Sequence, residues 1–217
     1  MRIVLVSCIL LIFGLTCIDG QQPAASLEVQ KANERPQAAA AGKEPFDDAD
    51  VKTMASKCVE LETEAGLIII ELYPESAPET VRNFLNLVAM GYFDTTTFSR
   101  IVPDFVVQGG NVWTREGGVT TEMGARARRR LKDEPNRILH ERGIVSMARG
   151  EEANTATTNF FILVSDSPHL DGTFAAFGRV VRGMDVADEI NKSKVTNEKP
   201  EKPVRIKKAS VKICGAD

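Results

Sequence analysis

A single permanent cation interrupts an otherwise apolar run in FSRIVPDFVVQGGN, residues 98–111. Arg100 stands between Phe98 and Ile101, in a pattern that predicts a β-strand and therefore a side chain carried by a rigid sheet. A charge among apolar neighbours is costly unless a polar group meets it. The stretch therefore has two interpretations: a strand-edge arginine paired with a carboxylate, or a fixed hydrogen-bond donor aimed at a substrate carbonyl.

Short runs typical of β-strands recur along the chain, separated by turn residues. They cover residues 59–63, 67–73, 97–102, 105–108, 143–147, 160–164, 175–180 and 204–213. A helix is predicted over 78–90, because Pro78 suits a first helical position and Gly91 suits a helix end. A second helix is predicted around 184–190. Many short strands with two helices favour a β-barrel closed by helices.

Residues 1–20 have the composition of a secretory signal peptide: a cationic start, an apolar stretch, and then small and polar residues. The stretch is too short for a comfortable membrane span. Two alternatives stay open, an uncleaved membrane anchor and acylation at Cys17. Residues 21–52 are rich in Gln, Ala, Pro, Glu and Lys and are interpreted as a flexible linker, so the folded domain is expected over 53–217.

Charge and motif content exclude several classes of function. The 27 basic and 30 acidic residues are interspersed, with a net charge of −3, which offers no footprint for nucleic acid and favours a soluble monomer. The densest basic run, residues 126–132, is expected in a solvated loop or on a short helix face. The sequence has two histidines but no closely spaced Cys/His set, no Gly-rich phosphate loop and no nucleophile elbow. We therefore expect neither a metal nor a cofactor.

Four segments in order, FSRIVPDFVVQGG, SMAR, NFFILV and LDGTFAAFG, are similar to the signature of the cyclophilin family of peptidyl-prolyl cis-trans isomerases. The resemblance extends over residues 58–214. It implies a mainly β fold, a closed eight-stranded antiparallel β-barrel capped by two helices. It also implies catalysis of rotation about the amide bond that precedes proline.

The resemblance assigns roles to individual residues. Arg100, Phe105 and Gln108 would be catalytic, with Arg100 donating to the proline amide and Gln108 bonded to the substrate backbone. The residues expected to bind substrate are Val106, Ala148, Arg149, Asn159, Phe161, His169, Leu170 and Phe174. Among these, Phe161 and Leu170 would join Phe105 in an apolar pocket for the proline ring, with Val106 at its rim.

Three substrate-binding positions depart from the best-known family pattern. Asn159 replaces a glutamine and shortens the donor arm, while Phe174 replaces a histidine and preserves a flat wall. His169 stands where many members carry a tryptophan that bonds cyclosporin, so weak or no cyclosporin binding is expected with isomerase activity retained. We expect the His169 ring to be partly buried against the pocket. Ala148 and Arg149 would hold the residue before proline through main-chain groups.

Two cysteines, Cys58 and Cys214, lie near the two ends of the expected domain. In the family fold the first and last strands are neighbours, so the resemblance implies a Cys58–Cys214 disulfide in an oxidising compartment. The alternative is a pair of buried, inert cysteines.

Proline isomerisation needs no metal site, phosphate loop or nucleophile, so its chemistry is compatible with the residues described above. The barrier is rotation about an amide of partial double-bond character, ~18–20 kcal/mol, and no covalent bond must form. A guanidinium can stabilise the twisted amide more than the planar one. We expect an isomerase that acts on proline-containing polypeptides and assists the folding of exported proteins. The alternative is a proline-segment binding module or chaperone with little catalysis.

Overall fold

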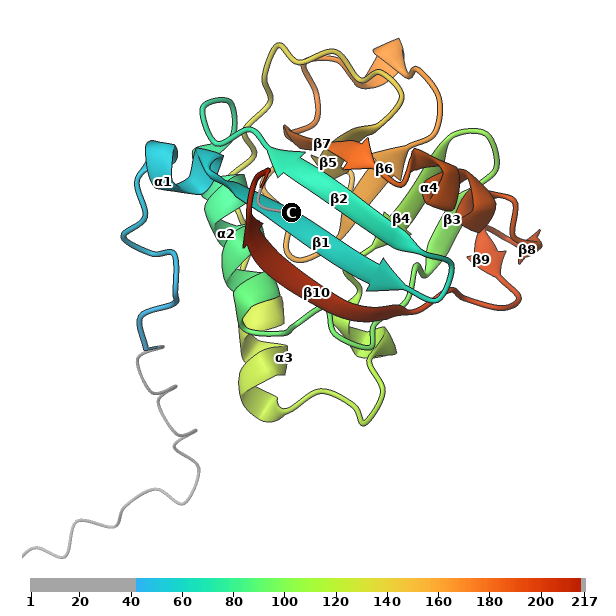
Figure 1. Cartoon of the computed structure of the whole chain (residues 1–217), viewed down its shortest axis with the longest axis horizontal. Helices are drawn as coiled ribbons and strands as arrows, with labels where there is room; N and C mark the ends of the chain where they lie inside the picture. Colours follow the sequence, from blue (N-terminus) through green and yellow to red (C-terminus); the bar gives the residue numbers. More distant parts are fainter. Residues whose placement is uncertain (1–41, 216–217) are drawn as a thin grey trace, which may run out of the picture. The chain divides into compact units, whose positions relative to one another are not determined.

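Eight short strands form the main sheet in the computed structural model, which describes residues 42–215 (Figure 1). In chain order they are β1 (Lys57–Thr63), β2 (Leu67–Leu72), β3 (Arg100–Val102), β4 (Val106–Gly109), β5 (Ile144–Met147), β6 (Phe160–Leu163), β7 (Ala176–Arg182) and β10 (Ile206–Ile213). All neighbouring strands pair antiparallel, in the spatial order β10-β1-β2-β7-β5-β6-β4-β3. The mainly β fold expected from the sequence is therefore present.

The sheet curls strongly but stays open, which corrects the expected closed barrel. Its edge strands β10 and β3 do not pair with each other, and an isolated bridge between Thr97 and Arg205 joins the segments that precede them. The outer edge of β3 has another partner: the Ile101 N–H donates to the Glu198 carbonyl at 2.8 Å. Glu198 belongs to a small hairpin of β8 (Val195–Thr196) and β9 (Lys199–Pro200), and this hairpin takes the place along β3 that β10 would need for closure.

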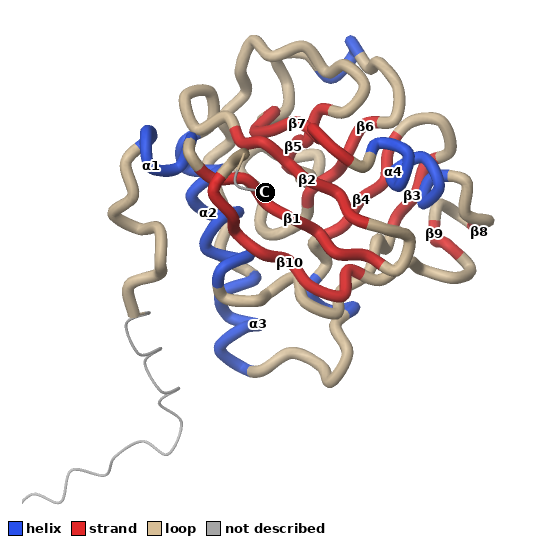
Figure 2. Tube along the Cα trace, viewed as in Figure 1, coloured by secondary structure: helices blue, strands red, loops and turns tan. Residues whose placement is uncertain are grey.

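Four α-helices occur among the described residues, where the sequence predicted two: α1 (Val51–Ala55), α2 (Pro78–Ala89), α3 (Thr121–Ala127) and α4 (Met184–Asn191). Both predicted helices, α2 and α4, are present; α2 packs against β10, and α4 packs against β2 and β4 (Figure 2). Two 3-10 turns, η1 (Val112–Thr114) and η2 (Pro168–Leu170), complete the elements. The two unexpected helices, α1 and α3, are short and depend on side-chain caps, Asp50 at α1 and Thr120 at α3.

The core has a large cluster and a small one. Phe84 of α2 lies at the centre of the large cluster, with its ring 4.9 Å from that of Phe177 and 5.3 Å from that of Phe160. The small cluster lies beside it and consists of Val106, Ile144, Phe161, Leu163, Leu170 and Ala176. It contains three of the residues expected to bind substrate, so the second cluster connects the fold to the site.

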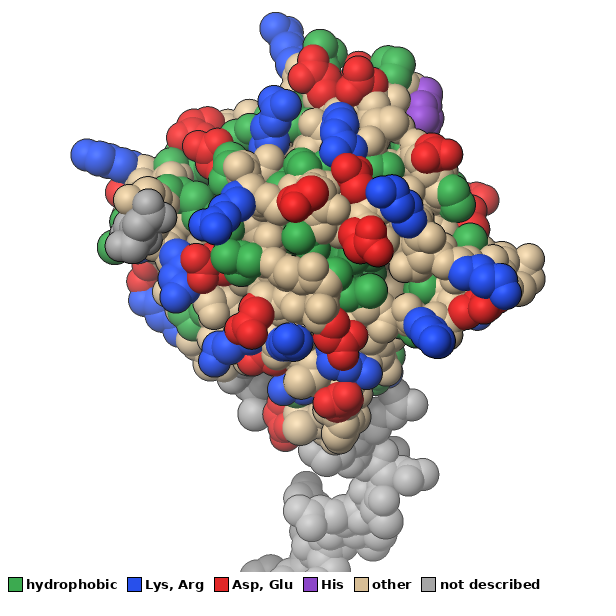
Figure 3. Space-filling view, turned by 45° about the vertical axis from the view of Figure 1, so that its right-hand side comes forward, with side chains coloured by type: hydrophobic (Ala, Val, Ile, Leu, Met, Phe, Trp, Pro, Cys, Tyr) green, Lys and Arg blue, Asp and Glu red, His purple; other side chains and the backbone are tan. Residues whose placement is uncertain are grey.

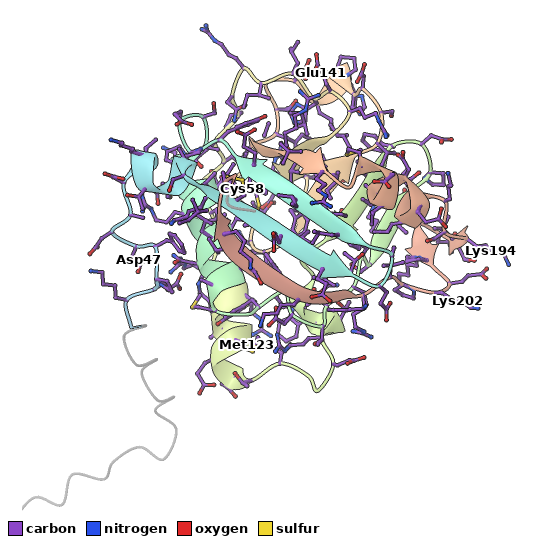
Figure 4. The ribbon with its side chains drawn as sticks, viewed as in Figure 1. Asp47, Cys58, Met123, Glu141, Lys194 and Lys202 are labelled. Carbon is purple, nitrogen blue, oxygen red and sulfur yellow. A yellow bond between two sulfur atoms is a disulfide. The ribbon has the colours of Figure 1, made fainter. Side chains whose placement is uncertain are left out.

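The first described residues already belong to the domain. Phe46 donates its N–H to Asn86 Oδ1 at 2.7 Å, and Arg82 Nη1 donates to the Phe46 carbonyl at 2.7 Å. Glu44 is buried against Arg126 of α3, and Asp47 lies beside α2 in Figure 4. This N-terminal segment (residues 44–50) was expected in the flexible linker, and Arg126 was expected in solvent. The predicted signal peptide and Cys17 lie outside the described residues.

A disulfide joins Cys58 of β1 to Cys214, which directly follows β10 (Figure 4). The two strands are register neighbours, with Cys58 opposite Lys212, so the ends of the domain meet at this point. Between residues 42 and 215 no helix has the length and apolar character that a membrane span requires.

Candidate active site

Strands β3 and β4 place the two most polar site residues side by side. Arg100 and Gln108 are register partners, and Arg100 Nη1 donates to Gln108 Oε1 at 3.3 Å. Arg100 Nε donates to Glu198 Oε2 at 2.7 Å. The Arg100 side chain is 41% exposed, so its guanidinium lies at the surface of the curled sheet with two of its nitrogens already held.

An apolar hollow of about 210 Å³ opens beside this guanidinium. Its lining contains nine of the eleven predicted site residues: Arg100, Phe105, Val106, Gln108, Ala148, Arg149, Phe161, Leu170 and Phe174. Phe161 stands directly opposite Gln108 across β4 and β6, and Leu170 is buried at the end of η2. The small core cluster thus supplies the floor, which is rigid because its members are packed into the sheet.

A cation over an aromatic ring forms one wall of the hollow. The Arg149 guanidinium carbon lies 4.9 Å from the centre of the Phe174 ring, within the range of cation–π attraction. Arg149 Nε lies 3.3 Å from Asp133 Oδ2, and both side chains are only 15% exposed. The Phe174 ring in turn meets that of Phe161 edge-on at 5.9 Å. Arg149 therefore contributes its side chain to the wall, in addition to the main-chain groups expected from the sequence.

A second, more polar hollow of about 450 Å³ adjoins the first. It shares Arg100, Gln108, Ala148 and Arg149 with the apolar hollow and adds Gly150, Thr155, Thr157 and Asn159. Asn159 thus lies beside the apolar hollow and not in its lining, and its buried Oδ1 has no hydrogen-bond partner among the described residues. Thr155 and Thr157 were missed because their loop carries no strand or helix periodicity.

His169 lies at the margin of the apolar hollow. Its ring centre is 5.4 Å from that of Phe105, but the residue is exposed, contrary to the expected partial burial. The turn η2 explains the difference, since it directs Leu170 inward and leaves His169 on the outer side.

The other histidine supports the site from within. His140 Nδ1 lies 3.1 Å from Asp171 Oδ1, and its Nε2 lies 2.9 Å from Ser146 Oγ. Burial lowers the pKa of His140 below its ordinary value of 6.5, and this effect exceeds the opposing one of Asp171. The neutral ring therefore ties β5 to the segment that follows Leu170. Sequence reasoning did not find this link, because Asp171 is 31 residues from His140 along the chain and no local pattern joins the two.

The family model for "Cyclophilin type peptidyl-prolyl cis-trans isomerase/CLD" matches residues 58–211. The chain is 40% identical over 154 residues to peptidyl-prolyl cis-trans isomerase ppi1 of Schizosaccharomyces pombe, covering 70% of this chain and 96% of the relative. It is 38% identical to peptidyl-prolyl cis-trans isomerase A of Dickeya dadantii, covering 70% and 82% of the two chains.

A similar solved structure is a cyclophilin-type peptidyl-prolyl cis-trans isomerase of Cryptosporidium parvum, crystallised in the presence of the dipeptide Ala-Pro. The TM-score is 0.62 at 29% sequence identity, and the match covers 71% of this chain and 98% of the other.

Proposed function

The chain belongs to the family of cyclophilin-type peptidyl-prolyl cis-trans isomerases, and we propose that it catalyses X–Pro rotation with Arg100 as the group that lowers the barrier. The observation that carries this proposal is the position of the Arg100 guanidinium at the mouth of the apolar hollow. A proline ring is apolar and its amide is polar, so the ring fits the hollow while the amide meets the cation.

The reaction requires a donor that favours the twisted amide. In the planar amide the nitrogen lone pair is delocalised into the carbonyl, and twisting returns it to the nitrogen. A guanidinium keeps its charge and presents several donors in one plane, so it can bond the twisted amide more strongly than the planar one. Arg100 Nη2 makes no hydrogen bond to the described residues and is the donor that we assign to the substrate.

The other predicted residues take roles that follow from their positions. Phe105, Phe161 and Leu170 hold the proline ring, and Gln108 bonds the substrate backbone while it holds Arg100. Asn159, which lines the adjoining polar hollow, is assigned to the substrate backbone on the N-terminal side of the proline. The substrate class is polypeptides that contain proline, in keeping with the Ala-Pro dipeptide named for the Cryptosporidium protein.

A proline-binding module or chaperone with little catalysis is the second candidate. A pure binder needs the apolar hollow but has no use for a half-exposed cation held by two acceptors. We favour the enzyme because a half-exposed guanidinium that lines the hollow suits catalysis better than mere binding.

The proposed setting is the folding of exported proteins by a monomer. The signal-like composition of residues 1–20 supports export, and the Cys58–Cys214 disulfide suits an oxidising compartment. On the face seen in Figure 3 acidic and basic side chains are interspersed, in keeping with a monomer that avoids nucleic acid. A retained signal or an acylated Cys17 would change the location but not the chemistry.

Weak cyclosporin binding is a further part of the proposal. His169 is exposed beside Phe105, and the chain's single tryptophan, Trp113, belongs to η1 and does not line the hollow. Replacing His169 by tryptophan should tighten cyclosporin binding while isomerisation of a short peptide is preserved. Nanomolar inhibition of the unaltered protein would contradict this part.

The function is tested by exchange NMR on a short X–Pro peptide, together with the refolding of a protein limited by proline isomerisation. We expect the protein to speed up both processes at catalytic concentrations. Binding of the peptide without faster cis-trans exchange would instead support the binding module.

A further inference from the structure

A strained two-residue turn joins β8 and β9 beside the active site (Figure 1). Asn197 has φ of 50° and Glu198 has φ of 62°, both in the left-handed region. Asparagine adopts this conformation readily, whereas for glutamate the contact between Cβ and backbone is unfavourable and glycine would be the easier choice. A glutamate kept at such a position needs a compensating interaction.

Glu198 holds β3 with both its main chain and its side chain. Its carbonyl accepts from the Ile101 N–H at 2.8 Å, and its Oε2 accepts from Arg100 Nε at 2.7 Å. Lys194 and Lys202, which flank this hairpin along the chain, lie at the right-hand edge of the molecule in Figure 4. One residue of the hairpin therefore contacts two consecutive residues of β3, one of which is the proposed catalytic arginine.

The ion pair between these residues is poorly suited to stabilise the fold. The side chains of Arg100 and Glu198 are 41% and 51% exposed, and exposed ion pairs contribute little to the free energy of unfolding. Its geometry is better suited to orient the guanidinium. Two acceptors on different sides, Glu198 at Nε and Gln108 at Nη1, restrict rotation of the planar group and leave Nη2 for the substrate.

We propose that Glu198 is a positioning residue, which acts through Arg100 and does not touch the substrate. The proposal depends on the proposed catalytic role of Arg100. A long arginine side chain loses much conformational entropy when it is fixed in one rotamer. Because Glu198 already fixes Arg100, this entropy is lost before the substrate binds. The twisted amide then meets a donor that is already aligned, so the benefit should appear in kcat more than in KM.

Three variants of the hairpin isolate this effect. Glu198→Gly removes the carboxylate and relieves the left-handed strain, so the fold should persist. Glu198→Gln keeps an acceptor oxygen and removes the charge. Glu201→Gln is the matched control, because Glu201 pairs with Lys194 at 2.9 Å and does not contact Arg100.

The measurements are kcat and KM for a short X–Pro peptide and the ¹⁵N resonance of the Arg100 Nε–H. For Glu198→Gly we expect kcat to fall about tenfold with KM nearly unchanged, and the Nε–H to exchange faster with water. Glu198→Gln should restore most of kcat and the slow exchange, and Glu201→Gln should match the parent protein.

Three results would overturn the proposal. They are an unchanged kcat in Glu198→Gly, a loss that glutamine does not restore, and a higher kcat in either Glu198 variant, which would make the carboxylate a competitor of the substrate. An Arg100→Ala variant measured in parallel distinguishes failure of the proposed role of Arg100 from failure of the proposed role of Glu198. If it keeps its activity, the proposed role of Arg100 is wrong, while the Nε–H resonance still reports whether Glu198 holds Arg100.

Discussion

Gly110 and Thr158 lie in direct contact, and Thr158 is next in sequence to Thr157 and Asn159 of the polar hollow. The Thr158 hydroxyl donates to the Gly110 carbonyl at 2.8 Å, and a Cβ on Gly110 would lie only 2.4 Å from the Thr158 carbonyl oxygen. Gly110 also has φ of 84°, in the left-handed region. The Gly109-Gly110 pair of the sequence motif therefore marks a close approach of two backbone segments, one after β4 and one before β6.

Alanine at position 110 should be strongly destabilising, because it combines backbone strain with a clash against another backbone segment. We expect Gly110→Ala to lower the free energy of unfolding by about 3 kcal/mol in denaturant titrations. Gly117→Ala is the matched control, since Gly117 has φ of 75° but a Cβ added there would meet nothing within 4 Å. It should cost about 1 kcal/mol. Equal losses in the two variants would show that the close approach does not matter.

The buried ion pair of Glu44 and Arg126 gives a second prediction. The two side chains are 6% and 8% exposed, and Arg126 Nη2 donates to Glu44 Oε2 at 2.8 Å. Glu44→Gln leaves a buried cation without its counter-charge and should lower the free energy of unfolding by about 3 kcal/mol. Asp48→Asn, in an exposed pair with Lys43, should have little effect. A harmless Glu44→Gln would mean that the N-terminal segment (residues 44–50) is not part of the folded domain in solution.

His140 predicts a pH dependence of stability. Burial lowers its pKa in the folded protein below the ordinary 6.5, so the unfolded chain takes up the proton first as the pH falls. The stability that His140 contributes is therefore complete above pH 6.5 and is lost as the pH falls toward the folded-state pKa.

Urea titrations from about pH 7.5 to 5.5 measure this loss. The free energy of unfolding should decrease in the parent protein and in His169→Gln, whose altered side chain is exposed, but much less in His140→Gln. Parallel slopes in all three proteins would contradict the assignment.

The disulfide between Cys58 and Cys214 closes a loop with a sequence separation of 156 residues. Such a cross-link restricts the unfolded chain, and its removal in Cys58→Ala/Cys214→Ala should cost about 2–4 kcal/mol. Mass spectrometry of an unreduced digest of the protein, produced in an oxidising compartment, should find the two cysteine peptides joined. Separate peptides with free thiols would contradict the disulfide and support the alternative of two buried, inert cysteines.

The sequence predicted the strands and the two longer helices because apolar periodicity and end signals are local properties. It did not predict the β8–β9 hairpin, whose strands have only two residues each and whose turn, Asn197-Glu198, contains no glycine. This omission explains the error over barrel closure, because the hairpin occupies the outer edge of β3. The core that forms around Phe84 follows from the predicted helix face.

For the candidate site, too, the sequence predicts the residues that lie in local motifs but not the contacts between distant segments. Most of the site's members are adjacent to recognisable motifs, whereas the carboxylate partner of Arg100, Glu198, is 98 residues away along the chain. The two interpretations of Arg100 that the sequence left open are compatible, since the arginine is paired with a carboxylate and also lines the apolar hollow. Pairing at such a distance depends on the fold and cannot be read from a local pattern.

The most direct test of the account is the isomerisation rate of a short X–Pro peptide with the parent protein and with Arg100→Ala, both shown to be folded by circular dichroism. Arg128→Ala is the control, because Arg128 is stacked on Trp113 outside the hollow. We expect kcat/KM to fall about 100-fold in Arg100→Ala and to be unchanged in Arg128→Ala. An Arg100→Ala protein with nearly the parent activity would contradict the claim that this guanidinium lowers the barrier.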